Sequence, residues 1–122
     1  MPETVLIVED EAYLAGLLSD VLQAAGYDVI LTTASRAAER AVETVPSAIV
    51  MDYLMPGLNG QQVVERIRGV LPDNSPPVIL VTGLSNAREL ARTVGADAYL
   101  RKPFDVDALV NLVDQFAKRR GP

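Results

Sequence analysis

Five short apolar runs, separated by longer stretches with helical periodicity, constrain the fold of this chain more than any other feature. The runs are too short for helices, so each predicts a strand; they are Val5–Val8, Val29–Leu31, Ala48–Met51, Val78–Val81 and Ala98–Leu100. Between and after them, apolar spacings of three or four residues predict helices over Leu14–Ala25, Arg36–Val45, Gln61–Leu71, Asn86–Val94 and Val106–Phe116. This alternation predicts a parallel sheet with right-handed crossovers and helices on both faces, a doubly wound sandwich.

The length of 122 residues fits one domain, which we expect to span residues 1–122. There is no internal repeat or linker, and the proline-rich stretch 72–77 is expected to be a loop. Gly26 and Gly95 follow the first and fourth predicted helices and are expected to end them. The basic residues Lys118, Arg119 and Arg120 are expected in the last turn of the final helix, where cations are favourable.

The composition excludes several kinds of site. The chain has no cysteine and no histidine, so disulfides and thiolate metal sites are excluded and any metal must be held by oxygen. A net charge of -5 opposes nucleic acid and anionic membranes as ligands. No apolar run has membrane-spanning length and no signal peptide begins the chain, so we expect a cytoplasmic protein.

Polar residues collect where the predicted strands end. In an open parallel sheet, ligands bind outside the carboxyl ends of the strands, so these residues are the candidate site. They are Glu9, Asp10, Glu11, Asp52, Thr82 and Lys102. Carboxylates crowded into one crevice resist ionising together unless a cation joins them, and a site with few oxygen ligands and room for water suits Mg²⁺.

Each of these residues also has a simpler interpretation. Asp10 could cap the first helix, with Glu9 and Glu11 enriched near its positive end, and Asp52 could begin a turn. Thr82 and Lys102, like Tyr99, could be satisfied or solvated side chains. Their joint placement at the ends of four predicted strands is what favours a functional site.

Four motifs in order resemble the response-regulator receiver family over essentially the whole chain. They are "VLIVEDE", "MDYLMPGLNG" with the pattern D-x-x-M-P-x-x-x-G, "VILVTG" and "YLRKPF". The resemblance, closest to single-domain regulators of the chemotaxis type, implies a flavodoxin-like (βα)5 three-layer sandwich of strand order 2-1-3-4-5. It implies a phosphoacceptor of a two-component or phosphorelay system. Such a domain is a signalling module that catalyses its own phosphorylation and dephosphorylation.

The resemblance also implies a role for each matching residue. Asp52 would accept the phosphoryl group from a phosphohistidine of a sensor histidine kinase or a histidine phosphotransfer protein. The implied Mg²⁺ ligands are Asp10 and Asp52 directly, the carbonyl of Leu54, and Glu9 through water. Lys102 would pair with a phosphoryl oxygen, and the Lys102–Pro103 bond would be cis.

Thr82 would bond another phosphoryl oxygen, and Tyr99 would turn inward when Thr82 moves. The fourth helix, fifth strand and fifth helix would form the output surface of a monomer or weak dimer. Gly83 would leave space for the phosphoryl group, while Pro56 and Gly57 would turn the chain away from Asp52.

Two departures from the family pattern stand out. Glu9 replaces the commoner Asp, although its longer side chain should still reach the ion through water. The segment "DVDALVNLVDQFAKRR" lacks the Glu-Leu and Ala-Arg pattern of winged-helix regulators, which argues against their dimer through the fourth and fifth helices.

Three other functions fit the sequence less well. A phosphohydrolase of the haloacid-dehalogenase type would carry an acid two residues after the nucleophile, where this chain has Leu54. A flavin or nucleotide binder would need a glycine-rich or P-loop motif, and neither is present. A pseudo-receiver, an interaction module without phosphorylation, would lack one of the acids or the lysine, and none is missing.

Overall fold

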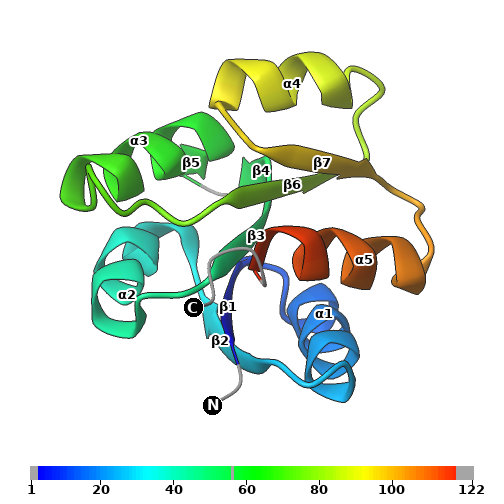
Figure 1. The fold of residues 1–122 in the computed structure, drawn as a ribbon. Coiled ribbons are helices and arrows are strands. Elements are labelled where there is room, and N and C mark those ends of the chain that lie inside the picture. The colour runs from blue at the N-terminus through cyan, green and yellow to red at the C-terminus, as the bar shows by residue number, and fades with distance from the viewer. Residues whose placement is uncertain (1–2, 56, 118–122) are drawn as a thin grey trace.

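The computed structural model describes residues 3–55 and 57–117. Its main sheet is parallel, with the order β2-β1-β3-β6-β7 (Figure 1). These strands are β1 (Thr4–Val8), β2 (Asp28–Thr32), β3 (Ala48–Asp52), β6 (Val78–Thr82) and β7 (Ala98–Arg101). The expected order 2-1-3-4-5 is confirmed, because β6 and β7 are the fourth and fifth strands of this sheet along the chain.

Helices cover both faces of the sheet (Figure 1). They are α1 (Ala12–Ala24), α2 (Ala37–Thr44), α3 (Gly60–Val70), α4 (Ala87–Val94) and α5 (Val106–Ala117). Helices α1 and α5 pack on one face and α2, α3 and α4 on the other. Gly26 and Gly95 follow α1 and α4 with φ of +100° and +81°, which confirms them as helix-ending residues.

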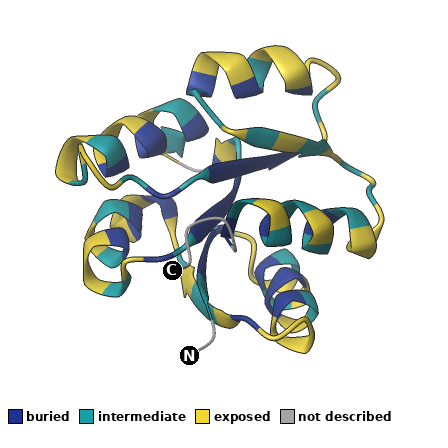
Figure 2. Ribbon diagram, viewed as in Figure 1, coloured by how far each residue is buried: buried dark blue, intermediate teal, exposed yellow. Residues whose placement is uncertain are grey.

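The core explains why the strand sequences are continuous apolar runs. Strands β1, β3 and β6 lie inside the sheet and are almost entirely buried, whereas the edge strands β2 and β7 are partly exposed (Figure 2). A strand covered by helices on both faces needs apolar residues on both. Polar residues therefore enter the central strands only at their ends.

Two local features differ from the expectations. A short 3-10 turn, η1 (Ala34–Arg36), precedes α2, so the helix expected over Arg36–Val45 is shorter at both ends. Val45 ends α2 with a φ of +44°, a left-handed conformation that is costly for a β-branched residue.

Among the described residues, no helix is long and apolar enough to cross a membrane.

An unpredicted hairpin follows β3. Its strands β4 (Leu54–Met55) and β5 (Leu58–Asn59) pair antiparallel, and Gly57 has a φ of +81°, as a tight turn requires. Asn59 then begins α3 through a capping box, because its side chain accepts from the Gln62 N–H at 3.0 Å while Gln62 accepts from the Asn59 N–H at 2.9 Å. The hairpin thus fixes the chain just beyond Asp52. Pro56, Lys118, Arg119 and Arg120 lie outside the described residues.

Candidate functional site

The strand register brings the predicted site residues to one edge of the sheet. Val8 lies beside Met51, so Glu9 and Asp10 follow β1 where β3 reaches Asp52. Asp52 is paired in turn with Val81, the residue before Thr82. The Lys102 N–H donates to the Thr82 carbonyl at 2.8 Å and places the lysine beside the same edge.

Asp52 contacts the predicted lysine directly. The Lys102 ammonium donates to Asp52 Oδ2 at 3.1 Å, and the backbone N–H of Tyr53 donates to Asp52 Oδ1 at 2.7 Å. Only 16% of the Asp52 side chain and 29% of the Lys102 side chain is exposed. A carboxylate can end a buried strand here because a cation and an amide satisfy it. The Lys102–Pro103 bond is cis, as expected.

Glu9 is a nearly buried carboxylate, with 9% of its surface exposed, and it feels the charges of Asp52, Asp10 and Lys102. Burial raises the pKa of Glu9 above its ordinary value, and the charges of Asp52 and Asp10 raise it further. The hydrogen bond from the Glu11 N–H, 3.0 Å long, and the charge of Lys102 lower the pKa. The three carboxylates therefore act on one another across a single crevice.

Asp10 does not cap the first helix, so that interpretation is wrong. The cap is Glu11, whose carboxylate accepts from the N–H groups of Tyr13 and Leu14. Asp10 instead accepts from the Ala34 N–H at 3.0 Å, which ties it to the start of η1. Sequence reasoning missed this bond, because it joins residues 24 positions apart.

The crevice offers carboxylate oxygens, the donors that a hard divalent cation takes in proteins. Three acids with one nearby lysine, Lys102, leave excess negative charge in the crevice. Within residues 3–55 and 57–117, no group of three or more Asp, Glu, His or Cys side chains is arranged to hold a metal ion. An ion bound directly by only two carboxylates, with water completing its shell, is the arrangement that Mg²⁺ favours.

On the other side of Asp52, the end of β6 presents a hydroxyl and a glycine beside Lys102. Thr82 is 1% exposed and its hydroxyl oxygen accepts from the Leu84 N–H at 3.2 Å. A Cβ added to Gly83 would meet only the Lys102 side chain, at 4.0 Å, so the backbone leaves open space here. Tyr99 lies on the adjacent strand β7 and is 40% exposed.

Comparisons with known proteins agree with this architecture. The family model described as "Response regulator receiver domain" matches residues 5–114. The transcriptional regulatory protein PrrA of Mycobacterium leprae is 38% identical over 96% of this chain and 51% of its own length. The phosphate regulon transcriptional regulatory protein PhoB of Pseudomonas aeruginosa is 30% identical over 98% of this chain and 54% of its own length. The chain thus spans about half the length of these relatives.

Solved structures show the same fold. A response regulator receiver domain from Bermanella marisrubri superimposes with a TM-score of 0.85 at 30% identity, over 95% of this chain and 98% of its own. The receiver domain of the sensor histidine kinase PA1611 from Pseudomonas aeruginosa, solved with a magnesium ion in its active-site cleft, gives 0.85 at 28% identity, over 97% and 99%. Sequence, sheet order and strand-end residues lead to one conclusion: the chain belongs to the response regulator receiver domain family.

Proposed function

We propose that this domain accepts a phosphoryl group on Asp52 and transmits its presence to an output partner or domain. The observation that carries the proposal is the contact of Lys102 with Asp52, 3.1 Å long, at the end of β3 beside Glu9 and Asp10. A carboxylate held next to a cation at an accessible strand end suits phosphoryl transfer, where positioning and charge neutralisation supply nearly all the catalysis.

In the proposed reaction, an Asp52 oxygen attacks the phosphorus of a partner's phosphohistidine. The P–N bond breaks, a P–O bond forms, and the electron pair of the P–N bond leaves with the imidazole, giving an acyl phosphate on Asp52. Lys102 lies close enough to exchange its bond with the carboxylate for one with a phosphoryl oxygen. The open space at Gly83 receives the group.

Mg²⁺ is the proposed cofactor, because the crevice holds more acids than cations. Asp10 and Asp52 would bind it directly, the Leu54 carbonyl would be a third ligand, and Glu9 would reach it through water. When bound, the ion supplies neutralisation of the charge on the phosphoryl oxygens. The bond from the Ala34 N–H at 3.0 Å and the bond from the Tyr53 N–H at 2.7 Å orient the two direct carboxylates in advance.

Thr82 and Tyr99 are the proposed reporters of phosphorylation. The Thr82 hydroxyl, whose oxygen accepts from the Leu84 N–H, would donate a charge-assisted bond to a phosphoryl oxygen. Movement of Thr82 toward Asp52 vacates space that the partly exposed Tyr99 ring can enter. The surface formed by α4, β7 and α5 would then present a different face to the output partner or domain.

The proposed donor is a sensor histidine kinase or a histidine phosphotransfer protein, and the proposed compartment is the cytoplasm. A cysteine-free, oxygen-only site is compatible with that compartment. The domain acts on itself, catalysing its own phosphorylation and dephosphorylation, and turns over no separate substrate in this proposal.

Intact mass spectrometry tests the proposal. We expect the chain, incubated with Mg²⁺ and a small acyl phosphate, to gain the mass of one phosphoryl group, and fragmentation to place it on Asp52. The gain should disappear when EDTA removes the metal. A chain that gains no mass under these conditions would be a pseudo-receiver, and a group located elsewhere would exclude Asp52 as the acceptor.

A further inference from the structure

The outer edge of β2 is unpaired in the described part of the chain, where β2 is bonded only to β1. Two backbone hydrogen bonds show which residues of β2 face β1. The Asp28 N–H donates to the Glu3 carbonyl at 3.0 Å, and the Thr32 carbonyl accepts from the Glu9 N–H at 3.1 Å. Even-numbered residues of β2 therefore face β1, and the backbone groups of Val29 and Leu31 point outward.

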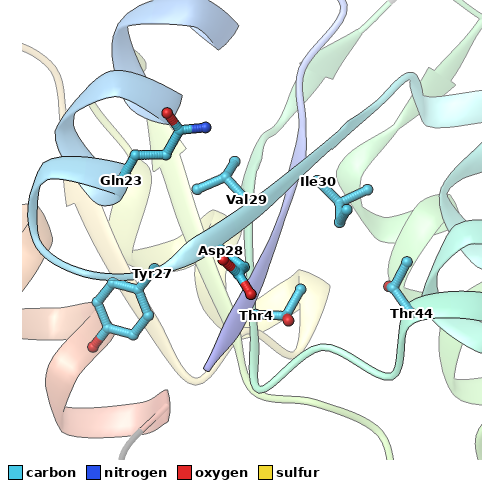
Figure 3. Close-up of a pocket in the computed structure, with 7 residues that line it drawn as sticks. All are labelled: Thr4, Gln23, Tyr27, Asp28, Val29, Ile30 and Thr44. Atoms are coloured by element: carbon cyan, nitrogen blue, oxygen red, sulfur yellow. The ribbon is translucent and has the colours of Figure 1, made fainter. Parts of the chain in front are cut away.

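Hollows run along this edge. One, of about 590 Å³, is lined by Val29 and Ile30, with Gln23 of α1 and Thr44 of α2 at its sides. Figure 3 shows Val29 and Ile30 on opposite sides of β2, next to Gln23 and Thr44 respectively. A second hollow, of about 370 Å³, lies at the carboxyl end of β2, where Leu31, Thr32 and Thr33 line it together with Glu9 and Asp10 of the crevice. Asp28 and Leu31 are exposed and Val29, Ile30 and Thr32 are partly exposed, so this edge of the sheet is open to solvent.

The sequence of β2 does nothing to block pairing. Edge strands usually carry a lysine, a proline or a bulge that prevents a further strand from adding. Strand β2 reads "DVILT" and has none of these, and Leu31 is 48% exposed. The opposite edge strand, β7, ends in Arg101 and is followed by Lys102 and Pro103.

We propose that β2 is a self-association surface, on which β2 of a second copy pairs antiparallel about a two-fold axis. One register satisfies every outward group: Val29 faces Leu31 of the second copy, and Ile30 faces Ile30. Val29 and Leu31 of opposite copies then exchange both N–H to carbonyl bonds. Both cross-strand pairs are apolar, which favours them on the sheet surface.

Charge complementarity selects this arrangement. The register places Asp28, which is exposed, opposite Thr32 of the second copy. Arg36 and Arg40 line the hollow at Thr32, and each forms an ion pair within its own helical segment, with Glu39 and Glu43 respectively. The Arg36 side chain is 58% exposed, so a surface pair of this kind leaves it free to turn toward Asp28 of the second copy. Parallel pairing would instead place the two Asp28 side chains together. Each copy carries a net charge of -5, so two copies repel each other at long range and need this local attraction to associate.

Sedimentation equilibrium over a concentration series tests the proposal on the 122-residue chain. We expect a weak dimer whose dissociation constant rises about tenfold with Leu31→Lys, because two symmetry-related pairs are lost. Val70→Lys is the matched control, since Val70 is 50% exposed at the end of α3, and it should leave the dimer unchanged. A wild-type chain that stays monomeric up to millimolar concentration, or equal effects of the two variants, would overturn the proposal.

Three further measurements separate this surface from any other. Asp28→Lys should weaken the dimer, and adding Arg36→Glu should restore it, because the exchanged charges face each other only across the β2 pair.

Amide exchange by NMR should show concentration-dependent protection at Val29 and Leu31. No such protection, or no rescue by the double change, would exclude this register. Added extended peptides that protect the same amides of a monomeric chain would identify another occupant. The dimer uses no residue of the Asp52 site, so either proposal can fail alone.

Discussion

The two sides of the Asp52 crevice differ in charge: one carries carboxylates and the other carries a lysine. On the β1 side, Glu9 and Asp10 bring carboxylates together, and burial and repulsion raise the pKa of Glu9. On the β6–β7 side, the same sheet edge carries a buried hydroxyl at Thr82, a glycine and Lys102. The first side is suited to a cation and the second to an anion. Asp52 lies between them and is the residue that both would use.

This contrast makes the sign of each variant's effect informative. Removing charge from the acidic side should weaken Mg²⁺ binding, whereas removing Lys102 should strengthen it, because the lysine competes with the ion for Asp52. Both changes should nevertheless impair phosphorylation. A site that served only to stabilise the fold would show no such crossed pattern.

Among the variants that keep Asp52, the largest effect is expected for Lys102→Ala. Its loss removes the cation that meets the phosphoryl oxygens, so the rate of phosphorylation by a small acyl phosphate should fall about a hundredfold. The Mg²⁺ affinity of Lys102→Ala, measured by calorimetry, should rise severalfold. Arg101→Ala, which removes an exposed neighbouring cation, is the control and should change neither. Weaker Mg²⁺ binding in Lys102→Ala would show that the lysine supports the metal.

Asp10→Asn should lower the Mg²⁺ affinity by at least about tenfold. The asparagine can still accept the Ala34 N–H, so the start of η1 should be preserved and the change should report charge alone. Asp20→Asn removes an exposed acid of α1 and serves as the control in the same calorimetric titration. Equal affinities for Asp10→Asn and Asp20→Asn would remove Asp10 from the ligand set.

Thr82→Ala should still accept phosphate but lose most of the phosphorylation-dependent change in amide exchange over Asn86 to Val94. The reason is that a ligand shifts a two-state equilibrium only through its differential contacts, and the hydroxyl provides them. Thr82→Ser retains the hydroxyl and should retain the response. If Thr82→Ala and Tyr99→Ala both respond fully, the signal travels by another route.

The smallest effect concerns the lifetime of the acyl phosphate. Leu54 lies two residues after Asp52, and Leu84 lies two residues after Thr82. Leu54 is 60% exposed. Leu54→Asn or Leu84→Glu should admit or orient water and shorten the lifetime severalfold, measured by the decay of the phosphorylated mass. Leu17→Asn, a similar change on α1, should not. An unchanged rate of decay in both site variants would show that the two leucines do not protect the acyl phosphate from water.

The sequence predicted the central sheet well because burial on both faces leaves a strong apolar signal, as in "AIVMD" of β3. It also placed Asp52 and Lys102 at strand ends, and the parallel register then brought them within 3.1 Å. The helices α1 and α4 were delimited by glycines that take positive φ. Local chemistry and a long-range pattern agreed at these positions.

The remaining features depend on contacts that no local pattern encodes. The bond of Asp10 with the Ala34 N–H requires β1 and β2 to be paired first, so the capping interpretation was equally available. The β4–β5 hairpin is only two residues long on each side, too short for periodicity to reveal. The Asn59–Gln62 capping box, by contrast, was visible as N-x-x-Q and could have been predicted.

The most direct test of the account compares Asp52→Asn with Asp73→Asn after incubation with Mg²⁺ and a small acyl phosphate. The amide oxygen introduced by Asp52→Asn can still accept the Tyr53 N–H, so the fold should persist, which circular dichroism verifies. Asp73 is an exposed loop acid remote in sequence from the strand ends. Intact mass should show one added phosphoryl group in the wild type and in Asp73→Asn, and none in Asp52→Asn. Uptake by Asp52→Asn to the wild-type extent would contradict the account.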